Sequence, residues 1–561
     1  MLRGSFAFLL ASAVALALGG CGTKEHEPDP VPERPNILLV VVDDMGYSDL
    51  GAFGGEIPTP NLDALAFEGV RFTNFITSPV CSPTRASLLT GVDPHLAGLG
   101  NLAEELSPNQ EGQPGYEGYL NDRVVTIASL LRDAGYRTFM TGKWHLGKDA
   151  EMSPAARGFD RSFAMLTNAS HFSDMRPAYS PDPEAKAMYR DDGRMIDVLP
   201  RGFDYSSQFF VDRMIEYLDP VDGAASPFFG YLAFSAPHWP LQAPDAALEA
   251  FRGRYDEGYD VMLERRLAEQ KRLGLIPADA VAAARSPKGR PWKELDEAGR
   301  AVEARAMEVY AAMIAEIDRH TGRLIDYLGN RGMLDNTVVI FLSDNGAEGH
   351  DLDDTWPADQ FPEIRAVIDQ RHDFSLENMG RPGSYTFYGP NWARVSAPAF
   401  RLFKAFPTEG GVRTAAFAWY PPRFRGGTLV DDLVLVRDIA PTILDLAGVR
   451  HPSREYRGRE VQPMTGRSAV DLLAGGVQSA VRLHVDEAIG KISVRRGAWK
   501  MVRMPPPHGT GSWELYDLDG DLAERRDLAA SRPEIVAELE AAWNRYVDDN
   551  GVILPDWLSG Y

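Results

Sequence analysis

Cysteine is nearly missing from this sequence: its 561 residues include only Cys21 and Cys81. Two cysteines do not make the dense disulfide framework that holds small secreted domains together. The chain is 44% hydrophobic and 25% charged, a composition typical of a globular protein rather than a disordered one. Because its length exceeds what one simple core supports, we expect one large domain and a smaller one.

Positive charge is also in short supply. The chain has 58 lysines and arginines against 80 aspartates and glutamates, which gives a formal net charge of −22. This balance argues against nucleic acid as a partner, because a protein that binds nucleic acid usually carries a basic surface. An anionic substrate is not excluded, since a local cluster of basic side chains can outweigh a diffuse negative surface.

Near its N-terminus the sequence lacks an apolar run long enough to span a bilayer. Residues 6–18 are apolar but short for a spanning helix, and they follow Arg3, so residues 1–21 are typical of a bacterial export signal. The end of this segment, Leu18-Gly19-Gly20-Cys21, resembles a lipobox. That resemblance implies a lipid anchor on Cys21 as the only membrane attachment, and a location in the periplasm or cell envelope. A plain signal peptide or a short membrane anchor is the alternative, and residues 22–35 are expected to form an extended tether.

Four short apolar runs are each followed by polar residues. The runs are 36–42, 136–141, 228–235 and 337–343, and the residues after them are Asp43-Asp44, Gly142-Lys143-Trp144-His145, Ala236-Pro237-His238 and Asp344-Asn345. Continuous apolar runs of this length predict strands that are buried on both faces of a parallel sheet. Helical spacing over 126–134 and 296–328 adds helices between them, so we expect an α/β sandwich. Sites in such sheets form beyond the carboxyl ends of the strands, where all four polar clusters fall and can converge.

Two of these strand ends predict a metal site. Three carboxylates and one amide there offer only oxygen ligands, which suit Ca²⁺ or Mg²⁺ rather than Zn²⁺. The four residues are Asp43, Asp44, Asp344 and Asn345. Clustered carboxylates repel one another, and a divalent cation relieves that repulsion. Taken singly, an aspartate after a strand is more often a turn former or a helix cap, which is the alternative interpretation.

The segment Cys81-Ser82-Pro83-Thr84-Arg85 places a thiol, a proline and an arginine within one turn, ahead of an apolar run. Proline is tolerated in the first turn of a helix, so Cys81 is expected just ahead of a helix N-terminus, where anions bind well. Arg85 would then lie one turn into the helix, on the same face. A nucleophile beside an arginine at such a place indicates attack on a tetrahedral oxyanion, sulfate or phosphate. An ordinary free cysteine is the alternative.

This segment and the Leu-Leu-Thr-Gly that continues it resemble the signature of type I sulfatases, in particular of the bacterial arylsulfatase branch. In that family a maturation enzyme oxidises the signature cysteine, here Cys81, to Cα-formylglycine, an aldehyde nucleophile. Lys143 and His145 lie in a stretch that resembles the second signature of the family. His238 matches a third, histidine-bearing segment, and Lys404 matches the late lysine of bacterial arylsulfatases. Alone, a lysine is usually a solvated surface group, and a histidine is usually a satisfied hydrogen-bonding residue.

The resemblance covers most of residues 34–448 and implies an alkaline-phosphatase-like fold. Residues 36–448 would be the catalytic domain, with a large, mostly parallel sheet between helices. Residues 449–561 would be a small C-terminal subdomain with an antiparallel sheet and one helix. The strands and the helix expected there are 483–485, 491–495, 500–502, 514–516 and 533–547. The long irregular segment 160–207 is expected to form part of the wall of the substrate cleft.

The resemblance also implies a cofactor and a nucleophile. Sulfate esters would be hydrolysed by the hydrated aldehyde at position 81, on a divalent cation that is usually Ca²⁺, with Mg²⁺ as the alternative. The residues implied as cation ligands are Asp43, Asp44, Cys81 in its oxidised form, Asp344 and Asn345.

Six residues receive catalytic roles from the resemblance, Cys81 as the nucleophile among them. Arg85 would hold the side chain at position 81 and the carboxylates of the metal site. Lys143, His238 and Lys404 would bind the sulfate oxygens and stabilise charge as it develops. His238, together with Lys404, would protonate the leaving alcohol or phenol, and His145 would remove the proton from the second hydroxyl of the hydrate.

The expected substrate is a sulfate ester of a small molecule or a sulfated glycan. A phosphonate monoester or phosphodiester hydrolase with the same aldehyde is one alternative, because sulfate and phosphate esters share a tetrahedral geometry. A surface lipoprotein that binds sulfated glycans without cleaving them is another. Lost ligands or a lost nucleophile would favour that second alternative, whereas every matched position is filled here.

Overall fold

The structure is a computed structural model that describes residues 34–557 except 168, 178, 181, 183, 222–225 and 478–479. The predicted lipobox cysteine, Cys21, and nearly all of the predicted tether lie outside the described residues. Within the described ranges, no helix combines the length and the apolar character that crossing a bilayer requires.

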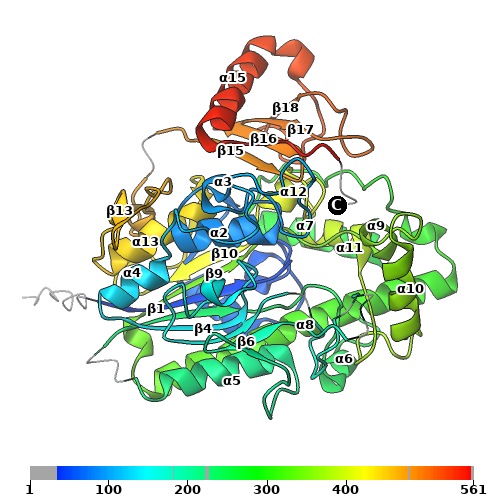
Figure 1. Ribbon diagram of the computed structural model, residues 1–561. Helices are drawn as coiled ribbons and strands as arrows, with labels where there is room; N and C mark the ends of the chain where they lie inside the picture. The colour runs from blue at the N-terminus through cyan, green and yellow to red at the C-terminus, as the bar shows by residue number, and fades with distance from the viewer. Residues whose placement is uncertain are drawn as a thin grey trace, which may run out of the picture. The chain divides into compact units, whose positions relative to one another are not determined.

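A ten-stranded mixed sheet forms the centre of the large part of the fold (Figure 1). Its strands, in spatial order, are β11 (Thr428–Val430), β2 (Val70–Phe72), β10 (Ala416–Trp419), β9 (Thr337–Ser343), β1 (Asn36–Val42), β8 (Phe228–Ala233), β4 (Arg137–Lys143), β5 (Arg161–Met165), β6 (Tyr189–Asp191) and β7 (Arg194–Ile196). The five strands from β9 to β5 run parallel to one another. Antiparallel partners flank them, β10 beside β9 and β6 beside β5. The four predicted strands correspond to β1, β4, β8 and β9, and the prediction of a mostly parallel sheet is confirmed.

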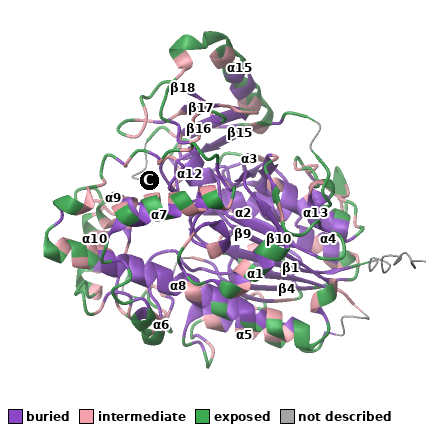
Figure 2. Ribbon diagram, turned by 180° about the vertical axis from the view of Figure 1, so that it is seen from behind, coloured by how far each residue is buried: buried purple, intermediate pink, exposed green. Residues whose placement is uncertain are grey.

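Helices cover both faces of this sheet. One face carries α1 (Pro60–Glu68), α5 (Ser206–Leu218) and α8 (Glu297–Asn330), and the other carries α2 (Cys81–Thr90), α3 (Pro94–Ala97), α4 (Ile127–Asp133) and α13 (Ile439–Leu446). Leu38 and Val40 of β1 pack on the first face, and Ile37 and Leu39 pack on the second. Because successive strand residues point to opposite faces, two covered faces leave all seven residues of β1 buried. Figure 2 shows the buried strands of the sheet; α2 is buried as well, whereas α1 and α5 also carry intermediate or exposed residues.

The longest helix, α8, agrees closely with the helical pattern predicted for 296–328. It spans Glu297–Asn330 and starts after Asp296, whose carboxylate accepts a hydrogen bond from the N–H of Gly299 at 2.8 Å. Such a cap satisfies one of the backbone donors that a helix leaves unpaired at its start. Shorter helices and strands complete the large part of the fold: α6 (Asp245–Ala250), α7 (Tyr259–Arg272), α9 (Leu352–Thr355), α10 (Pro362–Arg371), α11 (Gly389–Ser396), α12 (Glu409–Val412), α14 (Val470–Leu473), β3 (Phe75–Ile76), β12 (Val434–Leu435), β13 (Glu455–Tyr456) and β14 (Arg459–Glu460).

The C-terminal part of the chain forms a four-stranded antiparallel sheet with one helix packed on it. Its elements are β15 (Leu483–Ala488), β16 (Lys491–Arg496), β17 (Trp499–Arg503), β18 (Glu514–Asp517) and α15 (Pro533–Asn550). Leu539 and Trp543 of the helix share a small core of their own with Val494 and Met501 of the sheet. The predicted antiparallel subdomain is confirmed, and its boundary at residue 449 stays a prediction.

Buried polar contacts join this small sheet to the large part of the fold. Lys500 of β17 lies 2.7 Å from Glu409 of α12. Ser78, just ahead of α2, donates a hydrogen bond to Asp486 of β15 at 2.6 Å. These contacts place the C-terminal sheet beside the N-terminus of α2, which is the end that carries Cys81.

Candidate active site

The polar residues that follow four parallel strands meet at one edge of the sheet. Lys143, at the end of β4, has its ammonium 2.7 Å from Asp43, which follows β1. The backbone N–H of Asp44 donates to Asp344, which follows β9, at 3.3 Å. His238, beyond β8, places its Nε2 3.5 Å from Asp44. All five side chains are buried, so the structure brings together groups that lie up to 300 residues apart in the sequence.

The helix α2 presents Cys81 to this cluster. Cys81 is the first residue of α2 rather than the residue ahead of it, a difference of one position at a helix end. Its sulfur lies 3.5 Å from Asp43 and 3.6 Å from the ammonium of Lys143. All ten residues of α2 are buried, and Gly91 ends the helix at a φ of 69°, a left-handed conformation that suits glycine. The motif around Cys81 therefore encodes a buried helix with a defined end.

Oxygen ligands gather next to Cys81. Four buried side chains each offer one ligand atom, and these atoms lie within 4.8 Å of one another: Asp43, Asp44, Cys81 and Asp344. The amide nitrogen of Asn345 donates to Asp44 at 2.7 Å, whereas its buried Oδ1 has no hydrogen-bond partner among the described residues. Burying an amide oxygen without a partner is costly unless a ligand supplies one. This set of donors fits a hard divalent cation.

Arg85 connects two of the strand ends. Its Nε donates to Asp344 at 2.8 Å, and one terminal nitrogen lies 2.7 Å from the same carboxylate oxygen. The other terminal nitrogen donates to the backbone carbonyl of Lys143 at 2.9 Å. The guanidinium is fully buried, so Arg85 holds the carboxyl ends of β9 and β4 in a fixed relation beside Cys81.

Lys404 supplies another buried cation. Its ammonium lies 2.9 Å from Asp44 and 3.1 Å from Glu348, and all three side chains are buried. With Arg85 and Lys143, three cationic groups face the four carboxylates of this cluster. By formal charge, the cluster therefore carries one net negative charge when nothing is bound.

Burial and this charge pattern move the pKa values of two adjacent aspartates in opposite directions. Burial alone would raise the pKa of Asp43, but nearby cations, Lys143 first among them, outweigh it and leave that pKa below its ordinary value. Burial raises the pKa of Asp44 to about 8, although Lys404 opposes the rise. Asp44 also has a φ of 69°, which a residue other than glycine rarely adopts. Perturbed acids and strained backbone concentrate at functional sites.

His238 is a buried histidine beside the carboxylates. Its Nδ1 lies 2.7 Å from the carbonyl of Trp239, so the hydrogen-bond pattern assigns the proton to Nδ1 and the lone pair to Nε2, which faces Asp44. Burial holds the pKa of His238 well below its ordinary value, and Lys404 acts in the same direction. The imidazole is therefore neutral at rest, and it gives up a proton readily once Nε2 has received one.

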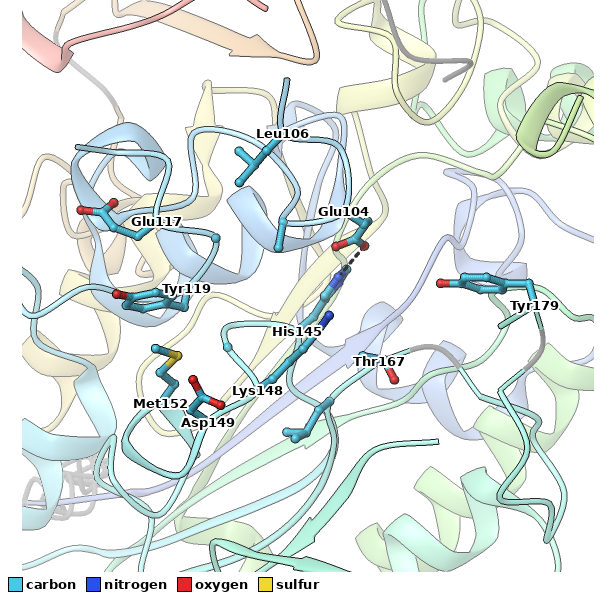
Figure 3. A pocket seen from close by; sticks show the side chains of 14 residues that line it. Glu104, Leu106, Glu117, Tyr119, His145, Lys148, Asp149, Met152, Thr167 and Tyr179 are labelled. Atoms are coloured by element: carbon cyan, nitrogen blue, oxygen red, sulfur yellow. Dashed lines mark hydrogen bonds and ion pairs between the residues drawn. The ribbon is translucent and has the colours of Figure 1, made fainter. Parts of the chain in front are cut away.

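His145, which follows β4, also lies near Cys81 and pairs with Glu104. Its Nε2 is 2.9 Å from Glu104, and Figure 3 shows the ring directed toward that carboxylate. The backbone of His145 has a φ of 57°, again in the left-handed region. The buried Nδ1 has no hydrogen-bond partner among the described residues, which leaves it available to a bound molecule. The structure shows no direct hydrogen bond between His145 and Cys81 in the described part of the chain.

A cavity of about 140 Å³ opens onto Cys81. Its polar lining includes His145, His238 and Lys404. Much of the remaining wall is aromatic: Tyr179, Trp239, Trp356, Phe361 and Trp557. The Tyr179 ring lies 6.1 Å from Trp239 and 4.7 Å from Trp356, measured between ring centroids. Tyr179 belongs to segment 160–207, which the sequence predicted to line the cleft.

A larger cavity of about 340 Å³ adjoins the first one (Figure 3). The two share Glu104, His145 and Tyr179. The carboxylates of Glu117 and Asp149 line the larger cavity as well. A molecule bound at Cys81 can therefore extend past His145 into a hollow whose wall includes three carboxylates, Lys148 and apolar side chains.

Two kinds of residue in this site escaped the sequence reasoning. Glu348 follows Asp344 by four residues on the same loop, and that proximity was the available signal. Tyr179, Trp356 and Trp557 carry no recognisable motif and come from three distant segments. Only the fold reveals that these aromatic side chains surround one cavity.

Comparison with known proteins identifies relatives along most of the chain. A family model described as Sulfatase matches residues 35–449, and one described as N-sulphoglucosamine sulphohydrolase, C-terminal, matches residues 400–547. An uncharacterized sulfatase of Schizosaccharomyces pombe is 42% identical over 530 residues, which are 93% of this chain and 95% of that protein. An arylsulfatase of Klebsiella aerogenes is 38% identical over 462 residues, 82% of this chain and 95% of that protein.

A solved structure shares the fold. The crystal structure of Ps i-CgsB in complex with k-i-k-neocarrahexaose aligns with a TM-score of 0.64 at 21% identity, over 94% of this chain and 95% of that one. At this identity the likeness shows the architecture alone, the large sheet between helices and the smaller C-terminal sheet.

Proposed function

This chain belongs to the sulfatase family, and on that premise we propose that it hydrolyses sulfate esters of the aryl type. The reaction breaks the S–O bond of the ester, consumes one water and releases inorganic sulfate and a phenol or alcohol. One observation carries the proposal. Cys81 begins a buried helix within hydrogen-bond reach of Asp43 and Lys143, at the base of a cavity.

The proposal includes oxidation of Cys81 to Cα-formylglycine. Burial raises the pKa of the Cys81 thiol well above its ordinary value, so an unmodified cysteine here would be a weak nucleophile. The hydrated aldehyde supplies an oxygen nucleophile and a second hydroxyl, through which sulfate can leave. Lys143, whose ammonium lies 3.6 Å from the sulfur of Cys81, can also donate a hydrogen bond to an oxygen at this position.

The proposal also includes a divalent cation, Ca²⁺ with Mg²⁺ as the alternative. Asp43, Asp44, Asp344 and Asn345 would hold it beside position 81. A bound cation supplies positive charge that stabilises the sulfate oxygens and favours ionisation of a nearby hydroxyl. The charge count supports this, since a cluster with one net negative charge repels a sulfate ester and a divalent cation reverses the sign.

The side chains around position 81 bind the sulfate group, transfer protons and hold the nucleophile in place. Lys143 and Lys404 bind and orient the sulfate group as charge develops on its oxygens. His238 relays through Nε2 to the leaving oxygen the proton that the attacking hydroxyl of the hydrate loses, and its low pKa favours the release of that proton. His145, held by Glu104, accepts a proton at Nδ1. Arg85 keeps the side chain at position 81 in line with Asp344.

The aromatic lining of the cavity at Cys81 supports aryl esters as the main substrate class, as does the similarity to the Klebsiella aerogenes arylsulfatase. A sulfated glycan is the second candidate. The adjoining cavity of about 340 Å³ favours it, because that cavity offers space for further sugar units.

Parallel assays test the proposal. The purified protein should hydrolyse 4-nitrophenyl sulfate much faster than bis(4-nitrophenyl) phosphate or a phenylphosphonate monoester. A preference for the phosphorus esters by orders of magnitude would instead identify the phosphodiester or phosphonate hydrolase. Binding of sulfated glycans without any turnover would identify a binding protein.

Mass spectrometry of the peptide that contains residue 81 tests the nucleophile. Active protein should carry the aldehyde or its hydrate, and unmodified cysteine in fully active protein would contradict the mechanism. Cys81→Ala should bind the cation without turnover. Cys81→Ser should at most react once, because a serine sulfate has no second hydroxyl from which to expel sulfate.

We also propose that the protein is exported and held on a membrane by a lipid on Cys21. The support is the sequence of residues 1–21, with its charged start, apolar run and lipobox-like end. Cys21→Ser should move the protein from the membrane fraction to the soluble fraction of an expressing bacterium. An unchanged distribution would leave the lipid anchor without support.

A further inference from the structure

After α15 the chain returns to the large part of the fold, where Asn109 and Tyr116 hold residues 553–556 by hydrogen bonds. We call these two residues the clamp. Ile553 exchanges two hydrogen bonds with the hydroxyl of Tyr116, at 2.8 and 3.1 Å. The side chain of Asn109 donates to the carbonyl of Leu554 at 2.9 Å and accepts from the N–H of Asp556 at 3.2 Å. Both clamping residues lie on the loop between α3 and α4. Residues 553–556 are therefore fixed against that loop rather than against the C-terminal sheet.

This clamp sets the position of Trp557. The side chain of Trp557 lines the cavity that opens onto Cys81, and the residue is 39% exposed. Trp239 and Trp356 line the same cavity from distant parts of the chain. The lining of the cavity thus includes one aromatic side chain, that of Trp557, from the C-terminal tail.

The charges around the cavity fix the orientation of a substrate. Lys404 is the only lysine or arginine among the described residues that line it, and it lies beside the carboxylate cluster. The sulfate group therefore belongs at that end, and the leaving group extends toward the aromatic rings. Glu104 and Glu105 also line the cavity, so a second anionic group on the substrate would meet carboxylates instead of cations.

We propose that Trp557 is a specificity-determining residue, which selects flat aromatic leaving groups. The proposal rests on the sulfatase function proposed above. An aromatic ring in the cavity would lie among the side chains of Trp557, Trp239 and Trp356, which all line it. Aromatic contacts of this kind change affinity by about two- to tenfold each.

Steady-state kinetics on the full-length, membrane-extracted or soluble enzyme test this. Trp557→Ala should raise KM for 4-nitrophenyl sulfate by about five- to tenfold with little change in kcat. Trp557→Phe should restore most of the loss. Inhibition by inorganic sulfate, which has no leaving group, should keep its wild-type inhibition constant in both variants. Leu554→Ala is the matched control, because this side chain lies outside the cavity and the clamp uses only its backbone carbonyl.

A second substrate and a second variant sharpen the test. The ratio of kcat/KM for 4-nitrophenyl sulfate to that for N-acetylglucosamine 6-sulfate should fall in Trp557→Ala. Asn109→Ala, which removes part of the clamp, should shift the same ratio in the same direction. An unchanged ratio in both variants would overturn the inference while leaving the proposed function intact. Absence of aryl sulfate hydrolysis in the wild-type enzyme would reject the proposed function itself.

Discussion

Glu348 offers a sharp test of the charge balance at the site. It is buried on the loop after β9, 3.1 Å from the ammonium of Lys404, and its other oxygen lies 2.6 Å from His350 Nδ1. Lys404 is thus shared between Glu348 and Asp44. Glu348→Gln keeps the size and an acceptor oxygen but removes the charge, so Lys404 should shift toward Asp44, one of the expected cation ligands.

The distance sets the size of the effect. Two unit charges 3.1 Å apart interact by about 5 kcal/mol at an effective dielectric constant of about 20. Desolvation cancels part of that, and removing one partner of a buried pair costs about 3–5 kcal/mol. The glutamine retains a neutral hydrogen bond worth about 1 kcal/mol. We therefore expect a loss of stability of about 2–4 kcal/mol and a cation affinity that falls about ten- to a hundredfold.

Activity across a Ca²⁺ titration measures this directly. The kcat/KM of Glu348→Gln for 4-nitrophenyl sulfate should fall most steeply at limiting cation and recover in part at saturation, and thermal unfolding should report the lost stability. Asp353→Asn is the control, since it removes one charge from an exposed position in α9, the helix that follows the loop of Glu348, where Asp353 pairs with Arg365 at 2.6 Å. Wild-type kcat/KM for Glu348→Gln over the whole titration would refute the reasoning.

Three further perturbations follow from the contacts. Arg85→Lys should lower the stability by roughly 3 kcal/mol and kcat/KM by at least tenfold, because a lysine cannot contact Asp344 and the carbonyl of Lys143 together. Thermal unfolding measures the loss of stability, and steady-state assays measure the loss of kcat/KM. Removal of divalent cations by a chelator should abolish turnover and lower the unfolding temperature. Added Ca²⁺ or Mg²⁺ should reverse both effects. Full activity after exhaustive chelation would exclude a catalytic cation. Burial lowers the pKa of His95, but its hydrogen bonds to Asp93 and Glu487 outweigh that and raise it to about 10. The stability that His95 contributes is therefore complete below pH 6.5 and is lost as the pH rises toward 10. His95→Gln should flatten this decline in urea unfolding, and an unchanged decline would exclude His95 as its source.

The core of the site could be predicted because parallel strands all end at the same edge of a sheet, so the residues that follow them lie close together. Lys143 and Asp43 lie 100 residues apart, yet they meet because β4 and β1 both end at the same edge of the sheet, with β8 between them. Continuous apolar runs identify such strands, since both faces are covered. The residue after each run is then placed at the edge without knowledge of any other contact.

The rest depended on contacts that no local pattern encodes. The flanking strands β2, β10, β6 and β7 have three or four residues each, too few for a period to emerge. The pairing of Lys404 with Glu348 depends on the conformation of the loop after β9, which no local pattern predicts. Trp557 reaches the cavity only because Asn109 and Tyr116 clamp the tail, and that contact joins segments more than 430 residues apart.

The charge pattern explains how a chain with a net charge of −22 can attract an anion. Each buried ion in the cluster would be unfavourable alone, and each is stabilised by a partner of opposite sign within 3.6 Å. By formal charge, the pairing stops one positive charge short of neutrality. Burial is the main cause of the raised pKa of Asp44, and the neighbouring carboxylates add to it. The divalent cation proposed above would correct the deficit and leave a net positive charge beside position 81, where we propose that the sulfate group binds. On this proposal we expect the affinity for the anion to depend first on the cation, and the negative surface elsewhere to have little influence because solvent screens it.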